Sequence, residues 1–113
     1  MLSRKTLALA SLCTIVCAQP GLAEEAFNGS KFLEFSQQAQ SSYIATAAAM
    51  AGVIATQNKP SVATCVDGWI AANSPTHFEP VLSVVRKQPQ YHPLGVVLAV
   101  LQKQCGSFNF TKP

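Results

Sequence analysis

The residues best suited to chemistry in this 113-residue chain are a few thinly spread cysteines and histidines. Thiolates and imidazoles bind zinc, and the four candidates are Cys65, His77, His92 and Cys105. They are separated by 11, 14 and 12 intervening residues. Compact structural zinc sites usually hold their ligands in close pairs about two to five residues apart. The spacing therefore argues against a metal site, and we expect neither a metal nor another cofactor.

Nucleophilic catalysis has no recognisable motif in the chain. A Cys–His hydrolase is disfavoured, because its nucleophile must remain a free thiol, whereas a disulfide is the favoured state of the mature cysteines. A Ser–His–Asp triad assembles in space, so sequence spacing does not exclude one. However, the chain carries no nucleophile elbow and no glycine-rich oxyanion loop. We therefore expect a protein without enzymatic activity and assign no catalytic residue.

The segment "QYHPLG", residues 90–95, places a phenol, an imidazole and a proline side by side. Pro89 ends one predicted helix, and Pro93 fits the first turn of the next one. The segment is thus predicted to be a structural corner rather than a catalytic or metal site, with Tyr91 packed at the corner and its hydroxyl outward. A partner contact at the corner is a secondary alternative.

The N-terminus has the three parts of an export signal. Arg4 and Lys5 give a positive head, the run from Thr6 to Ala18 is almost uncharged, and Gly21-Leu22-Ala23 supplies small residues for cleavage. We predict a signal peptide over residues 1–23, a cut after Ala23, and a single small domain over residues 24–113. The expected location is periplasmic or secreted. Neither of the cysteines in the signal follows a small residue, which argues against a lipid anchor.

Two cysteines remain after cleavage, Cys65 and Cys105, because Cys13 and Cys17 leave with the signal. An even pair in an exported chain is most simply one disulfide. It would close residues 65–105, a loop of 41 residues, for which chain entropy gives about 4 kcal/mol. That is a large share of a small domain's stability of roughly 5–15 kcal/mol.

The charge of the mature chain points to no nucleic acid. Residues 24–113 carry six Lys and Arg against five Asp and Glu, a net charge of +1. Nucleic-acid binding needs a clustered basic face, and the one adjacent basic pair is Arg86-Lys87. We therefore expect no nucleic-acid partner. We expect a protein partner instead, and no stable membrane anchor. The oligomeric state stays open.

Apolar spacing predicts an all-α fold, a compact bundle of four to five short helices with one inter-helix disulfide. The first helix runs through residues 31–35 with Asn28 or Ser30 as its cap. The others cover residues 38–57, residues 60 or 61 to 73, a stretch that starts at Ser74-Pro75 or nearer Glu79, and residues 93–105 with Gly106 as C-cap. His77 is expected in the first turn of the fourth helix, and Asp67-Gly68 as a surface kink or a break in the third.

Each predicted helix has an apolar face. In the second helix the bulky face is Tyr43, Ala47, Met50 and Ile54, beside a slim surface of Ala48, Ala49, Ala51 and Gly52 that admits a close neighbour. Trp69 is predicted to be a core or interface anchor. The remaining faces are Val62, Cys65, Val66, Trp69 and Ile70; Phe78, Val81, Leu82 and Val85; and Leu94, Val97, Leu98, Leu101 and Cys105.

The order of these features resembles a known family. The stretches "NGSKFL", "SSYIATAAAMAGVIA", "VLSVVRKQP" and "HPLGVVLAVLQKQCG" are similar to the Tai/Rap group of periplasmic immunity proteins, which protect bacteria against amidase toxins of type VI secretion. The matching anchors are Gly29, Leu33, Tyr43, Cys65, Pro89, Pro93 and Cys105. Members often have a further cysteine in the first helix, where this chain has Ser36.

The resemblance implies an all-α domain with a Cys65–Cys105 disulfide that binds a cell-wall amidase and blocks its cleft. One alternative is a periplasmic acid-stress chaperone similar to the HdeA proteins. Such a switch needs many carboxylates, and the mature chain has five. A further alternative is a domain that binds some other envelope protein.

Overall fold

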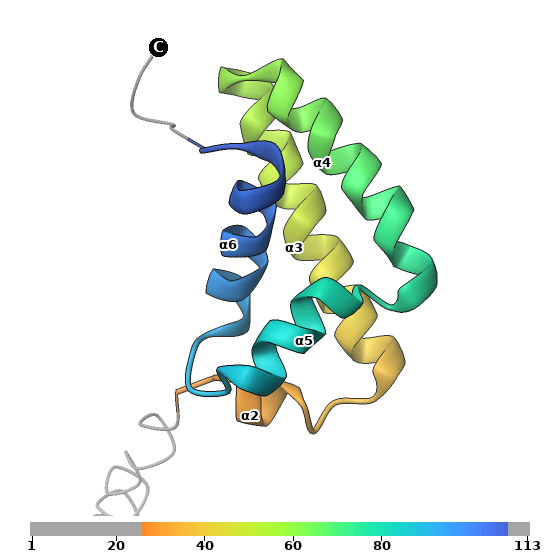
Figure 1. Cartoon of the computed structure of the whole chain (residues 1–113), viewed down its shortest axis with the longest axis vertical. Helices are drawn as coiled ribbons and strands as arrows, with labels where there is room; N and C mark the ends of the chain where they lie inside the picture. Colours follow the sequence, from red (N-terminus) through yellow and green to blue (C-terminus); the bar gives the residue numbers. More distant parts are fainter. Residues whose placement is uncertain (1–25, 109–113) are drawn as a thin grey trace, which may run out of the picture.

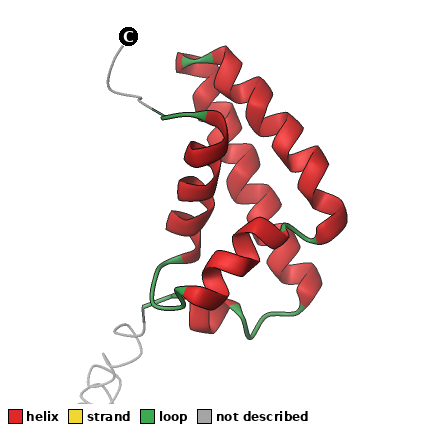
Figure 2. Ribbon diagram, in the orientation of Figure 1, coloured by secondary structure: helices red, strands yellow, loops and turns green. Residues whose placement is uncertain are grey.

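A computed structural model describes residues 26–108, and every regular element in this range is a helix (Figures 1 and 2). The predicted all-α fold is therefore confirmed. The elements are α2 (Gly29–Phe32), α3 (Gln37–Asn58), α4 (Pro60–Asn73), the 3₁₀ turn η2 (Ser74–Thr76), α5 (Glu79–Lys87) and α6 (Pro93–Cys105). The predicted signal peptide, residues 1–23, lies outside the described residues. No helix in the described range is long and apolar enough to cross a membrane.

The longest helix, α3, forms a hairpin with α4, and α6 packs against both of them (Figure 1). α5 crosses the lower end of these three helices, with α2 packed against it. The core between the helices is built from aliphatic and aromatic side chains, among them Phe32, Ile44, Val66, Val85 and Leu101, which are fully buried. No polar or charged side chain of the described range is buried.

α3 meets the core through its small residues. Ala48, Ala51 and Gly52 are buried, as predicted, whereas Ala49 is exposed. A Cβ atom added to Gly52 would lie 3.4 Å from Cγ1 of Val66, so the α3 backbone comes close to α4. The predicted bulky face is therefore only in part a core face: Tyr43 and Ala47 pack partly buried against the core, whereas Met50 is 62% exposed and Ile54 is 46% exposed.

Side-chain caps set the starts of three helices. Asn28 Oδ1 accepts a hydrogen bond from the Lys31 amide at 3.1 Å, and Ser36 Oγ accepts one from the Ala39 amide at 3.2 Å. His92 Nδ1 accepts one from the Leu94 amide at 3.1 Å. Each cap satisfies an amide that has no partner inside its helix. Asn28 is thus the cap of α2, which begins at Gly29 rather than at Lys31.

The connection from α4 to α5 agrees with the second of the two predicted helix starts, nearer Glu79, and differs from the prediction at Ser74-Pro75 and His77. Ser74-Pro75 starts a 3₁₀ turn, and His77 and Phe78 follow in the left-handed region with φ of 56° and 61°. His77 therefore lies outside α5, which begins at Glu79. If the helix began at Ser74-Pro75, Pro80 would lie in its interior and remove a main-chain hydrogen bond. Because α5 begins at Glu79, Pro80 lies in the first turn, where the backbone amide has no partner within the helix.

The other helix ends agree with the prediction, and the remaining differences lie inside α4 and on one side of α6. α4 runs unbroken through Asp67 and Gly68, so there is neither a kink nor a break there. α6 ends at Cys105 with Gly106 as C-cap at φ of 96°. Its buried side is rotated from the prediction, since Val96 is buried while Leu94 is 41% exposed.

Candidate functional site

The predicted disulfide joins Cys65 of α4 to Cys105 of α6, with the two Cα atoms 5.6 Å apart. Of the four residues considered as zinc ligands, the structure joins Cys65 and Cys105, whose sulfurs are bonded to each other. Cys65 Sγ also lies 3.9 Å from the Gln104 carbonyl oxygen, a contact without a proton because a disulfide sulfur carries none. Within the described range no group of three His, Cys, Asp or Glu side chains could hold a metal.

The remaining titratable groups are scattered. His77 Nδ1 lies 3.2 Å from Ser41 Oγ, and the Glu79 carboxylate pairs with Arg86 on the surface of α5. Asp67 faces α3, since its Oδ1 lies 3.8 Å from the position of a Cβ on Gly52. The Ser41–His77 contact pairs a hydroxyl with an imidazole, but it lies exposed on the surface. A catalytic triad also needs a third group that orients the imidazole and donors that stabilise an oxyanion.

The corner at residues 89–92 is held by main-chain hydrogen bonds to α2. The Gly29 amide donates to the Tyr91 carbonyl oxygen at 2.9 Å, and the Ser30 amide donates to the Pro89 carbonyl oxygen at 3.1 Å. Tyr91 projects outward and is 55% exposed. The corner is therefore a structural connection, as predicted.

An aromatic cluster lies behind this corner. The ring of Phe27 lies 5.4 Å from the His92 ring, 5.9 Å from Tyr43 and 6.4 Å from Phe32, measured between centroids. These edge and tilted contacts are favourable for aromatic pairs. Burial in this cluster raises the pKa of the Tyr43 hydroxyl. The His92 ring is thus committed to capping and packing, which leaves it no evident role as a catalytic base.

The first candidate interaction surface is the exposed side of α3. Met50, Val53 and Ile54 are 62%, 65% and 46% exposed, and we name these three residues the α3 stripe. A shallow groove of about 420 Å³ lies nearer the start of the same helix, between Tyr43 and Ala47 of α3 and Leu94 of α6. The sequence analysis placed Met50 and Ile54 on one apolar face of this helix, as packing residues and not as an interaction surface. It did not include Val53, whose spacing of three and one from them was the available signal.

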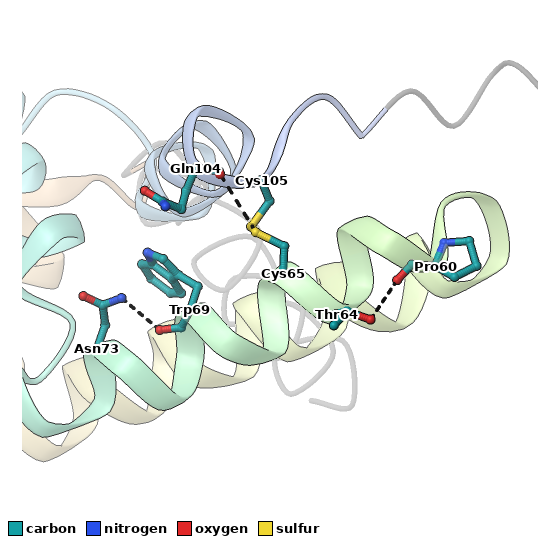
Figure 3. The surroundings of a disulfide bond; sticks show 7 residues. All are labelled: Pro60, Thr64, Cys65, Trp69, Asn73, Gln104 and Cys105. Carbon is teal, nitrogen blue, oxygen red and sulfur yellow. Dashed lines mark hydrogen bonds between the residues drawn. A yellow bond between two sulfur atoms is a disulfide. The ribbon is translucent and has the colours of Figure 1, made fainter.

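The second candidate surface is a groove between α4, α5 and α6, which we name the Trp69 groove. It encloses about 630 Å³ beside the disulfide and is lined by Trp69 and Asn73 of α4, Pro80 and Val84 of α5, and Lys103 and Gln104 of α6. Figure 3 shows Trp69 rising from α4 between Asn73 and the disulfide, toward Gln104 of α6. Trp69 was predicted as a core or interface anchor, but the groove beside it was not foreseen.

No protein-family model, curated protein or solved structure matches this chain.

Proposed function

We propose that this chain is an exported domain that catalyses no reaction and acts by binding another protein, specifically as an immunity-type inhibitor of a cell-wall amidase. The observation that carries the proposal is the α3 stripe. Its three large apolar side chains lie within five residues, and each is about half exposed or more. Neighbouring apolar side chains exposed to water are typical of interaction sites. Burying them against a partner contributes about 25 cal/mol of favourable free energy per Å² of apolar surface.

The way α3 is held supports a binding role. The helix has 22 residues, about 33 Å of length, and its small-residue face is packed against α4. The disulfide fixes α4 to α6. A surface that is already ordered loses little conformational entropy on binding, which favours affinity. A rigid convex helix of this kind suits the blocking of a cleft.

The specific target comes from the resemblance described above and from the predicted export. An inhibitor of a cell-wall amidase has to meet its target in the envelope, where a disulfide persists. The scattered titratable groups of the described range favour a binder over an enzyme. The acid-stress alternative is weaker, because the chain has few carboxylates whose protonation could expand the fold.

The proposal is tested by expressing the full chain with its own leader and a C-terminal tag, then capturing partners from envelope extract at neutral and acidic pH. One stoichiometric amidase at neutral pH, whose hydrolysis of peptidoglycan stops at a one-to-one ratio, is the expected result. Many clients at acidic pH alone would instead favour the chaperone. A different single envelope protein would favour the general binding role.

Matched variants assign the contact to the α3 stripe. Val53→Glu places a charge in the stripe and is expected to abolish capture, because an unpaired charge would be buried at the interface. Ala71→Glu makes the same change in charge on an exposed position of α4 and should leave capture intact. Equal capture by both variants would contradict the assignment. Circular dichroism of both proteins checks that the helices persist.

A further inference from the structure

The Trp69 groove lies apart from the α3 stripe and has a chemistry of its own. Its walls come from three helices, and the apolar part is formed by Pro80, Val84 and Val100. The Cys65–Cys105 disulfide ties α4 to α6 at one end of the groove. The two helices that form opposite walls are therefore linked covalently, which gives the groove a fixed width.

The indole of Trp69 gives the groove an oriented hydrogen-bond donor. Its ring packs on Phe78 with centroids 5.6 Å apart, and its carbonyl oxygen accepts a hydrogen bond from Asn73 Nδ2 at 2.9 Å. Although the residue is only 7% exposed, no buried side-chain nitrogen of the described range lacks a partner. Trp69 Nε1, for which residues 26–108 supply no acceptor, therefore reaches solvent on the side of Gln104 (Figure 3).

The charge of the groove is positive. Among the lining residues that belong to the described range 26–108, Lys103 is the only charged side chain. The carboxylates of the neighbouring helices are directed elsewhere: Asp67 of α4 faces α3, and Glu79 of α5 is paired with Arg86. An ammonium and an indole N–H beside an apolar wall favour a ligand that brings an anionic acceptor together with aliphatic groups.

We propose that the Trp69 groove binds a carboxylate carried by an apolar peptide segment. The carboxylate accepts hydrogen bonds from Lys103 Nζ and Trp69 Nε1, and the neighbouring aliphatic side chains lie against Pro80, Val84 and Val100. The carboxylate can be a C-terminal one or that of a glutamate side chain, because both present the same two oxygens. This site is independent of the α3 stripe and does not rest on the proposed inhibition of an amidase.

The chain carries its own reporter for this site, since Trp69 is its only tryptophan. We would titrate the full mature protein with short synthetic peptides, following tryptophan fluorescence and the single indole ¹H–¹⁵N signal. The probes are N-acetyl-Ala-Leu-Leu with a free or an amidated C-terminus, and N-acetyl-Leu-Glu-Leu-amide with its glutamine counterpart. The free acid or the glutamate peptide should shift the indole signal in a saturable way, and the neutral peptide of each pair should not. Whichever acidic peptide binds identifies the source of the carboxylate.

Two variants separate the groove from general charge effects. Lys103→Gln should weaken binding of the acidic peptide about three- to fivefold, the range of an exposed ion pair. Lys59→Gln removes the same charge at the exposed start of α4 and should leave binding unchanged. Added salt should weaken binding to the wild type more than to Lys103→Gln.

Three outcomes would overturn the proposal: no saturable shift of the indole signal with any of the four peptides, equal binding of acidic and neutral peptides, or equal loss in both lysine variants. None of them affects the capture experiment on Val53→Glu, so the failure of one proposal is distinct from the failure of the other. Thermal unfolding of both lysine variants confirms that their folds are unchanged, since both positions are exposed.

Discussion

The amide of Gly29 donates a hydrogen bond to the carbonyl oxygen of Tyr91 at 2.9 Å, which joins the first helix to the corner before the last one. The two residues are 62 positions apart in the sequence, so this hydrogen bond connects the beginning of the described range to the segment just before its last helix. The approach is close enough that a Cβ on Gly29 would lie 2.9 Å from Cα of Pro89 and from Cγ1 of Val85. Glycine is required here by space rather than by its dihedral angles.

Gly29→Ala is expected to destabilise the protein by about 1–3 kcal/mol, the range found when a core is overpacked. The added methyl group meets the backbone at Pro89, which cannot move without disturbing the two hydrogen bonds of the corner. Urea unfolding followed by circular dichroism measures the change in the free energy of unfolding. A variant as stable as the wild type would show that the corner is not tightly docked.

Gly68→Ala is the matched opposite case. Gly68 lies inside α4, and a Cβ there would have no atom within 4 Å. Alanine in an exposed helix interior is favoured over glycine by roughly 0.5–1 kcal/mol. The same unfolding experiment should therefore show a gain in stability, and a loss would contradict the open surroundings of this residue.

Replacing both Cys65 and Cys105 by alanine should lower the free energy of unfolding by about 2–4 kcal/mol. The disulfide links positions 40 residues apart, so its loss enlarges the unfolded ensemble. The measurement compares the double variant with the oxidised and the reduced wild type. Reduced wild type and the double variant should agree closely; a reduced wild type as stable as the oxidised form would show that the disulfide does not stabilise the fold.

Local signals predicted the ends of the helices well. Pro60, Pro93 and Gly106 act within a turn of their own positions, by fixing φ, removing a donor or tolerating a positive φ. The bounds of α4 and α6 are therefore close to those expected from the sequence. The pairing of Cys65 with Cys105 was also predictable, because the predicted signal cleavage would leave only these two cysteines in the mature chain.

The buried side of α3 could not be predicted in the same way. Apolar residues surround this helix between Tyr43 and Ala55, so no periodic pattern separates inside from outside. The small residues face the core because they let α4 approach closely, and the bulkier Met50, Val53 and Ile54 are left on the outside. That choice depends on the neighbouring helix, which is also why the Trp69 groove had no signal in the sequence.

The turn between α4 and α5 stores strain that substitution can test. His77 has φ of 56°, where residues other than glycine lose roughly 1–2 kcal/mol. His77→Val should destabilise the protein by about 1 kcal/mol or more, because β-branched side chains avoid this region. His77→Gly should be at least as stable as the wild type. Both variants lose the contact with Ser41, so their difference in urea unfolding reports on the backbone alone; no difference would contradict the strain.

The partly buried phenol of Tyr43 predicts a loss of stability at alkaline pH. Burial raises its pKa above the ordinary value of 10.0, because the phenolate would lose its hydration. The folded state therefore binds this proton more tightly than the unfolded state, and the resulting stability is complete below about pH 10 and is lost as the pH rises through the folded pKa. Urea unfolding of the oxidised protein from about pH 8 to about pH 11 should show a smaller alkaline loss in Tyr43→Phe than in the wild type. Tyr91→Phe, at an exposed position, is the matched control and should keep the full loss. An identical pH dependence of the wild type and Tyr43→Phe would mean that the phenol is solvated in the folded protein.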